Sequence, residues 1–205
     1  KNDPRFRALL DAGDPTVGRM VAAHHQHQST VQEVEQALRK LKAEVDTTIG
    51  ARKHFSASGH DLIITIGGDG TLLRASHEIA RTPILAVNSA PDHSVGFFCG
   101  AKLGQVEGAL AKFLDGSIKR TELTRMKVTV GERVVAARVL NDALFCHSSP
   151  AATSRYLIRI GDVEEEHKSS GFWIGPAAGS TAAQRSAGGQ ELPLGSKRLQ
   201  LVVRE

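Results

Sequence analysis

The sequence is poor in three features that would place a protein in a special class. Its 205 residues include only two cysteines, Cys99 and Cys146, which are too few for a disulfide framework and fit a reducing compartment. No apolar run reaches the roughly 18 residues of a membrane-spanning helix, so we expect no membrane partner. The net charge of +4 is small and dispersed, so we expect no nucleic-acid partner.

The composition is that of a folded protein, with 40% apolar and 23% charged residues. These fractions argue against disorder, and the length allows one large domain or two small ones. We expect a cytoplasmic protein. Because the chain begins at Lys1 rather than Met and ends at Glu205 directly after an apolar run, we also expect a fragment, which leaves an organellar targeting segment open.

A long amphipathic helix is predicted near the N-terminus. Ser29 and Gln32 have the spacing of a capping box, and apolar residues then recur at steps of three and four as far as Gly50, a typical stop. The helix is therefore expected to begin at Ser29 and end before Gly50. The preceding residues give little signal beyond a turn at Asp14-Pro15.

The next segment predicts a βαβ unit. Residues 62–66 and 84–88 are apolar runs typical of strands that are buried on both faces. Between them lie a glycine turn and a helix-compatible stretch, 71–80. This order favours a parallel sheet, and residues 102–115 have the spacing of a further helix.

The second part of the chain changes to β structure. From Leu123 to Ile160, short apolar runs are separated by turns such as Gly131-Glu132, a pattern that indicates antiparallel strands. We place the boundary near residue 119. The predicted organisation is an α/β domain at 1–118 followed by a β-rich domain at 119–205.

The feature with the clearest chemical meaning is Gly67-Gly68-Asp69-Gly70-Thr71, which follows the first predicted strand and opens a helix. In open α/β sheets, ligands bind at the carboxyl ends of the strands. Glycines there let backbone N–H groups approach phosphate oxygens, and a helix N-terminus favours anions. A carboxylate would repel phosphate, so Asp69 needs another role, such as accepting a proton, orienting a hydroxyl or holding Mg²⁺. Alternatively, Asp69 only caps the helix, and the glycines form a tight turn.

Two further stretches are candidates for ligand contacts. Asn141-Asp142 offers an amide donor and a carboxylate acceptor to ribose hydroxyls, or it forms a turn. The small residues of 179–189 would let a flat or polyanionic ligand lie close to the backbone. A flexible surface loop is the alternative for this stretch.

The histidines His24, His25 and His27 are the one metal-like pattern. His24 and His27 could share a helix face, but no acidic or cysteine partner supports a metal site. We therefore assign no metal ligands and expect a solvated polar patch.

The three motifs occur in an order that resembles the NAD kinase family, over residues 30–205. GGDGT at 67–71 is similar to the first motif of that family, Leu140-Asn141-Asp142 to the second, and 179–189 to the glycine-rich third. GGDG alone is shared with several kinases, whereas the ordered set is specific. Flanking stretches also look like the family; they are 88–97, 149–155 and 169–171.

The resemblance implies that ATP, with Mg²⁺, phosphorylates the 2′-hydroxyl of the adenosine ribose of NAD or NADH to give NADP(H). It implies a homodimer or homotetramer, and an α/β domain followed by a β-rich domain with the nucleotide between them. Asp69 resembles the family's proposed base for the hydroxyl. The implied binding residues are Gly67, Gly68, Gly70 and Thr71 for the phosphates of the donor, Asn141 and Asp142 for the dinucleotide, and Thr181, Ala182 and Ser186 for the adenosine pocket.

The chain departs from the family pattern in several places. Ala183 stands where many members have an aromatic residue, and Ser170 where many have Asp. The first strand of the family is not recognisable in residues 1–28, and its last β segments are missing after Glu205, so we expect a fold that is incomplete at both ends. The runs around Ser170 and Gly179 favour the branch that includes NADH-preferring kinases.

Three alternatives share part of this pattern. A diacylglycerol or sphingosine kinase would carry a second glycine-rich turn after the next strand, where this chain has residues 88–92, Asn-Ser-Ala-Pro-Asp. A phosphofructokinase would explain only the GGDG run. A non-catalytic dinucleotide-binding module would keep the pocket but lose the base, and Asp69 is present.

Overall fold

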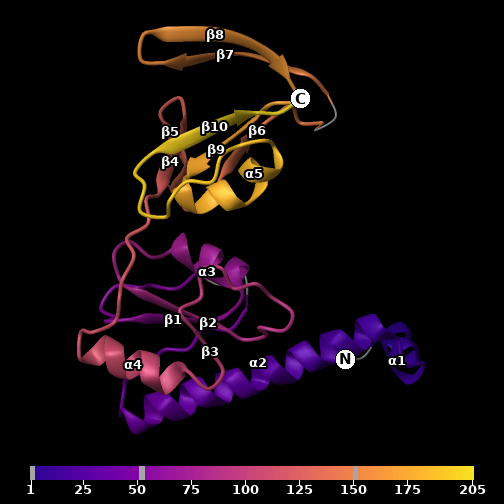
Figure 1. Ribbon diagram of the computed structural model, residues 1–205, viewed down its shortest axis with the longest axis vertical. Coiled ribbons are helices and arrows are strands. Elements are labelled where there is room, and N and C mark those ends of the chain that lie inside the picture. The colour runs from indigo at the N-terminus through magenta and orange to yellow at the C-terminus, as the bar shows by residue number, and fades with distance from the viewer. Residues whose placement is uncertain (1–2, 51–53, 150–151) are drawn as a thin grey trace. The chain divides into compact units, whose positions relative to one another are not determined.

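The computed structural model describes residues 3–50, 54–149 and 152–205. Residues 1, 2 and 51–53 of the predicted first domain, and residues 150 and 151 of the 149–155 stretch, lie outside the described residues. The chain divides between Lys119 and Arg120 into two units (Figure 1). None of the helices in the described part of the chain is long and apolar enough to cross a membrane.

The first unit is built on a three-stranded parallel sheet in the order β1-β2-β3. β1 (Ile63–Gly67) pairs along its whole length with β2 (Ile84–Asn88), so that Gly67 lies opposite Asn88. β3 (Ala101–Lys102) is short. The predicted parallel βαβ arrangement is confirmed, with the first strand displaced by one residue.

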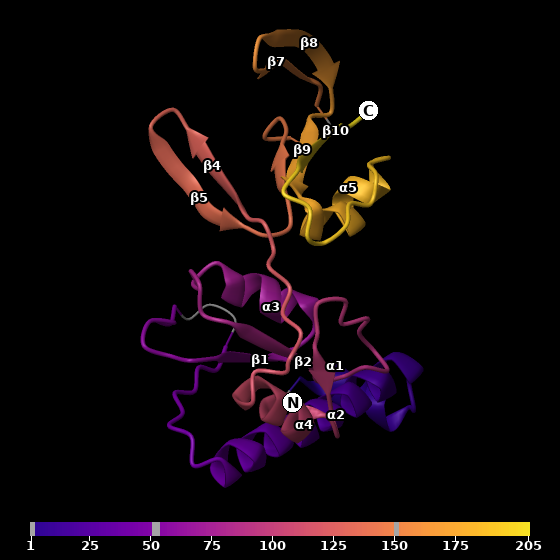
Figure 2. The same cartoon turned by 60° about the vertical axis from the view of Figure 1, so that its left-hand side comes forward.

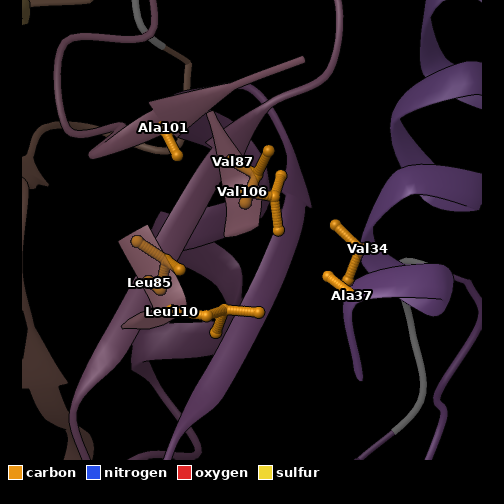
Figure 3. Close-up of a cluster of buried hydrophobic side chains, with 7 residues drawn as sticks. All are labelled: Val34, Ala37, Leu85, Val87, Ala101, Val106 and Leu110. Carbon is orange, nitrogen blue, oxygen red and sulfur yellow. The ribbon is translucent and has the colours of Figure 1, made fainter. Parts of the chain in front are cut away.

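Helices cover both faces of this sheet, which explains why its strands read as unbroken apolar runs. Alternate residues of β1 and β2 point to opposite faces. On one face, α2 (Pro15–Lys40) and α4 (Val106–Leu114) complete a cluster of buried side chains; its members are Val34, Ala37, Leu85, Val87, Ala101, Val106 and Leu110 (Figure 3). On the other face, the smaller cluster involves α3 (Asp69–Ser76); its buried members are Ala57, Ala75 and Ile79. Fully burying one Val, Leu or Ile side chain in such a cluster contributes about 1.5–3 kcal/mol to the stability of the fold.

The long helix α2 begins well before the predicted start, so the capping box at Ser29 is wrong. The carboxylate of Asp14 accepts hydrogen bonds from the backbone N–H groups of Thr16 (2.8 Å) and Val17 (3.2 Å). Pro15 is the first helical residue, a position at which its fixed φ is favourable. Asp14-Pro15 is therefore a helix start rather than the predicted turn.

The same helix also ends earlier than predicted, at Lys40. Lys42 has a left-handed φ of +53°, and its N–H donates to the carbonyl of Arg39 (3.0 Å). The N–H of Ala43 donates to the carbonyl of Leu38 (3.1 Å), which completes a Schellman motif. The residues that continue the apolar spacing beyond this point are exposed; they are Val45 and Ile49.

The other helices of the first unit differ in extent from their predictions. A short helix, α1 (Pro4–Asp11), was not predicted, and residues 3–28 contain no strand. α3 begins before residue 71 and ends before residue 80, the two bounds of its prediction, and α4 lies inside the predicted range 102–115. The predicted helices are thus present, with inaccurate ends.

The second unit is rich in β structure, as predicted. β9 (Phe172–Pro176) lies between β10 (Leu199–Val203) and β6 (Ala143–Phe145) in an antiparallel sheet (Figure 1). Two hairpins form separate antiparallel pairs (Figure 2), with positive φ at Gly131 and Gly161 in their turns. These hairpins are β4 (Met126–Val130) with β5 (Arg133–Val139), and β7 (Ser154–Ile160) with β8 (Val163–Ser169). After β9 come the 3₁₀-helix η1 (Ala177–Thr181) and the short helix α5 (Ala183–Ser186).

The contact between α2 and the start of α4 gives a first test. The Glu33 carboxylate accepts hydrogen bonds from the N–H groups of Gly104 (2.7 Å) and Val106 (3.1 Å), and so caps α4 from another helix. We expect Glu33→Ala to lower the free energy of unfolding by about 1 kcal/mol, as the loss of a helix cap does. Urea denaturation of the full chain measures this change.

The matched control is Glu35→Ala on the same helix. Glu35 forms only an exposed ion pair with Arg39 (3.5 Å), and such pairs contribute about 0.3–0.5 kcal/mol. Equal losses of stability in the two variants would contradict the capping role of Glu33.

Candidate functional site

The GGDGT run forms the junction between β1 and α3. Gly67 ends the strand, and Gly68 is the N-cap residue of the helix. The turn is tight, because the N–H of Thr71 donates to the carbonyl of Gly68 (2.9 Å). A Cβ atom on Gly67 would lie 2.1 Å from Thr71 Oγ1, and one on Gly68 would lie 2.5 Å from Ser94 Oγ. Any larger residue at either position would push these groups apart.

The carboxylate of Asp69 binds a loop rather than its own helix. Its Oδ2 accepts a hydrogen bond from the N–H of Phe97 (2.9 Å), and its Oδ1 accepts one from the N–H of Phe98 (2.9 Å). The residue at the N-cap position of α3 is Gly68. The alternative in which Asp69 only caps α3 is therefore wrong, and Asp69 holds the loop between β2 and β3 beside the turn.

Asn88 shapes the same loop from the end of β2. Its side chain is buried; Nδ2 donates to the carbonyl of Ser94 (2.9 Å), and Oδ1 accepts from the N–H of Ala90 (3.2 Å). Gly96 has a φ of +61°, and a Cβ there would lie 2.3 Å from Asn88 Nδ2. These contacts gather polar groups at the carboxyl edge of the sheet, where α/β proteins bind ligands.

Cys99 lies at the end of this loop, half-buried. Its Sγ is 3.9 Å from the carbonyl oxygen of Gly67. Burial, with a smaller contribution from the negative charge of Asp69, raises the pKa of the Cys99 thiol to about 11. The thiol is therefore protonated at neutral pH, and its thiolate fraction is far smaller than that of an ordinary cysteine.

In the second unit, the other two predicted motifs contact each other. Asn141 and Asp142 connect β5 to β6, and Asn141 Nδ2 donates to Asp142 Oδ2 (3.0 Å). A Cβ on Gly179 would lie 1.7 Å from the backbone oxygen of Asn141, and one on Gly175 would lie 2.3 Å from it. The glycine-rich segment thus packs directly on the Asn141 peptide. Burial raises the pKa of the Asp142 carboxyl.

The third motif is ordered by the hydroxyl of Ser180. This side chain is fully buried; its Oγ donates to the carbonyl of Ala177 (2.7 Å) and accepts from the N–H of Leu192 (2.9 Å). The segment forms η1 and α5, so the flexible-loop alternative is wrong. Two predicted pocket residues, Thr181 and Ala182, are half-buried and Ser186 is exposed, which leaves all three accessible to a ligand.

Gln184 is a buried polar residue that the sequence analysis missed. Its Oε1 accepts a hydrogen bond from Gln200 Nε2 (3.2 Å), whereas its Nε2 has no partner in the described part of the chain. That Nε2 lies 2.5 Å from the Cβ position of Gly175 and 2.9 Å from that of Gly179. Glutamine is usually exposed, so nothing in the sequence marked this position.

Within residues 3–50, 54–149 and 152–205, no group of three or more His, Cys, Asp or Glu side chains could hold a metal ion. The expected solvated histidine patch is wrong for His27, because its Nδ1 lies 2.9 Å from Ser89 Oγ.

A parallel sheet with a glycine turn at its carboxyl edge is the architecture of α/β proteins that bind phosphates and nucleotides. Comparison with known proteins narrows this class. A family model described as the ATP-NAD kinase N-terminal domain matches residues 5–118, more than half of the chain. The chain belongs to the ATP-NAD kinase family.

Individual relatives agree with this assignment. A probable NADH kinase of Oryza sativa is 39% identical over 167 residues, which cover 71% of this chain and 51% of that protein. An NADH kinase of Arabidopsis thaliana is 36% identical over 168 residues, 71% of this chain and 53% of that protein. The chain therefore spans about half the length of these curated relatives.

Solved structures give the same fold. An NAD kinase from Archaeoglobus fulgidus, solved in complex with ATP, is similar with a TM-score of 0.67 and 25% identity; the match covers 84% of this chain and 67% of that one. A yeast NADH kinase solved with NADH matches with a TM-score of 0.62 and 19% identity over 71% of this chain and 44% of that one. Because its identity is only 19%, the match to the yeast NADH kinase supports the fold alone.

Close packing at Gly179 provides a test of the second unit. We expect Gly179→Ala to lower the free energy of unfolding by about 2 kcal/mol, because the added methyl group would overlap a backbone oxygen that cannot rotate away. Urea denaturation is the measurement. Gly195→Ala is the control, since a Cβ there meets nothing within 4 Å, and a comparable loss in that variant would contradict the explanation.

The raised pKa of Cys99 predicts how the thiol reacts with an alkylating agent. In a Cys146→Ser background, we expect the alkylation rate by iodoacetamide to rise with a midpoint near pH 11 rather than 9.0, because only the thiolate reacts. Asp69→Asn should move the midpoint to lower pH, since it removes a nearby negative charge. A midpoint at or below 9.0 in the parent protein would show that the thiol is not desolvated.

Proposed function

We propose that this chain carries the catalytic centre of an enzyme that phosphorylates NAD or NADH with ATP. The acceptor is the 2′-hydroxyl of the adenosine ribose, and the products are NADP or NADPH and ADP. The observation that carries the proposal is the carboxylate of Asp69, held by two loop amides at the carboxyl edge of the sheet, beside glycines that admit no side chain. Membership of the ATP-NAD kinase family supports it.

In the proposed reaction, the ribose hydroxyl oxygen attacks the γ-phosphorus of ATP. The bond from that phosphorus to the oxygen bridging to the β-phosphate breaks, and the hydroxyl proton passes to Asp69. Each Asp69 oxygen accepts one backbone N–H, whereas a carboxylate offers about four acceptor positions, so capacity remains for the hydroxyl. The two hydrogen bonds from the N–H groups of Phe97 and Phe98 hold the carboxylate in one orientation, which favours an in-line reaction.

The binding roles follow the same proposal. Gly67, Gly68, Gly70 and Thr71 would bind the phosphates of ATP through backbone N–H groups and the helix N-terminus. Mg²⁺ would arrive as part of the ATP complex and would supply charge neutralisation on the phosphates. The dinucleotide would be contacted by residues of the second unit, which are Asn141, Asp142, Thr181, Ala182 and Ser186.

NADH is the favoured acceptor within this proposal. The relatives from Oryza sativa and Arabidopsis thaliana are both named as NADH kinases, at 39% and 36% identity. The small residues of 169–171 and 177–181 agree with that branch of the family. We further propose a cytoplasmic homodimer or homotetramer, supported by the family resemblance, and light scattering of the purified chain tests its mass.

The substitution Asp69→Asn tests the role of the carboxylate. We expect turnover to fall by about 10²-fold or more, because the base is lost, while dinucleotide binding stays measurable. The amide also places an N–H₂ group against one loop N–H, so the melting temperature should fall as well. If Asp69 only anchored the loop, binding and turnover would decline together. Asp61→Asn, an exposed position ahead of β1, is the control that should keep full turnover.

An assay with both dinucleotides separates the proposed kinase from the alternatives. The chain is incubated with ATP and Mg²⁺ and with either NAD or NADH, and NADP(H) is detected enzymatically. Parallel reactions contain diacylglycerol or sphingosine in place of the dinucleotide. We expect product from at least one dinucleotide, with the higher rate from NADH. Binding of a dinucleotide without any product would favour a non-catalytic module, and product from diacylglycerol or sphingosine alone would favour a lipid kinase.

A further inference from the structure

A hydrogen-bond network outside the three motifs links the helix α2 to the GGDGT turn. Ser89, the residue after β2, is buried, and each of its polar groups has a partner. Its N–H donates to the carbonyl of Gly67 (3.4 Å), and its Oγ lies 2.9 Å from His27 Nδ1. Its carbonyl oxygen lies 3.5 Å from the hydroxyl of the fully buried Thr30, whose one proton is shared with the nearer carbonyl of Gln26 (2.9 Å).

The same face of α2 also contacts the loop between β2 and β3 beyond Ser89. Gln26 Nε2 donates to the carboxylate of Asp92. The early part of the loop is thus attached to α2, whereas Asp69 attaches the later part through the N–H groups of Phe97 and Phe98. Both attachments therefore hold the loop between β2 and β3, which lies beside the GGDGT turn.

The carbonyl held by Ser89 belongs to the peptide between Gly67 and Gly68. A peptide unit is planar, so the direction of the Gly67 C=O bond also determines the direction of the Gly68 N–H bond. Glycine on both sides leaves that plane free to rotate at little steric cost. Whatever holds the Gly67 carbonyl therefore determines whether the Gly68 N–H points to a ligand at the turn.

We propose that His27 is a positioning residue for the GGDGT turn and that it acts through Ser89. This inference rests on the proposed function, in which the N–H groups of the turn bind the phosphates of ATP. His27 holds the Ser89 hydroxyl, the Ser89 N–H holds the Gly67 carbonyl, and the Gly67–Gly68 peptide is kept in one orientation. Without the imidazole, the peptide rotates between orientations and the bound phosphates lose one donor for part of the time.

The consequence is specific to the phosphate donor. His27→Ala should weaken the binding of ATP with Mg²⁺ and lower kcat, each by about tenfold, because a small misplacement of a binding group is costly at a reacting centre. Dinucleotide affinity should stay within twofold of the parent value, because its proposed contacts belong to the second unit. A variant that merely destabilised the fold would weaken both ligands and lower the melting temperature in proportion.

The experiment compares three variants of the full chain by calorimetric titration with ATP and Mg²⁺, by titration with NADH and by steady-state kinetics. His27→Asn keeps a polar atom near the position of Nδ1, so we expect it to recover most of the lost ATP affinity. His25→Ala is the control on an exposed position of the same helix, and it should behave as the parent. Parent-like ATP affinity and kcat in His27→Ala would overturn the proposal, as would an equal loss of NADH affinity.

Amide hydrogen exchange separates this inference from the proposed function. In the absence of any ligand, His27→Ala should raise the exchange rate of the Ser89 amide by about tenfold, because its hydrogen bond to the Gly67 carbonyl opens more often. Ser89→Ala should give the same increase, and the double variant should add little, since both changes break one link. If the parent neither binds ATP nor forms NADP(H), the proposed function fails. Unchanged exchange in His27→Ala would overturn the positioning role whatever the activity of the parent.

Discussion

Close packing against the backbone, at positions where a Cβ atom would overlap a neighbouring oxygen, is the constraint on which both candidate sites depend. In the first unit, Gly67 and Gly68 let the chain turn from β1 into α3 against Thr71 and Ser94. In the second unit, Gly179 lies on the peptide of Asn141 so closely that a methyl group would overlap its oxygen. The glycines therefore do more than provide flexibility. They bring backbone N–H and C=O groups close enough together to form a defined polar surface at the end of a sheet.

The polar groups at the first site serve the fold as well as the chemistry that we propose. Asp69 accepts two loop amides, Asn88 bonds to both sides of the same loop, and Ser89 connects the turn to α2. An unpaired carboxylate at this edge would be mobile and would favour no single geometry. Backbone N–H groups fix this carboxylate without a competing side chain, and in the proposed reaction they would orient it beside the phosphates of ATP.

The sequence predicted the elements of the fold better than their ends. Runs of β-branched residues located β1 and β2 to within one residue, because a strand that is covered on both faces has a simple apolar signature. Periodicity misplaced α2 in both directions. The helix starts at a side-chain cap at Asp14, and it ends at Lys40, where the backbone hydrogen bonds of the following turn outweigh the apolar spacing that continues to Ile49. Periodicity measures one face of a helix and carries no information about such caps.

The sequence by itself determined the order of the motifs, the parallel βαβ unit and the candidate residues, because these depend on residue type and local spacing. Only the tertiary structure decided what those residues contact. It showed that Asp69 binds the amides of Phe97 and Phe98, that Asn141 lies under Gly179, and that His27 reaches Ser89. Each of these contacts joins segments that are distant along the chain, and the packing of α2, the sheet and the glycine turns is what brings them within hydrogen-bond distance.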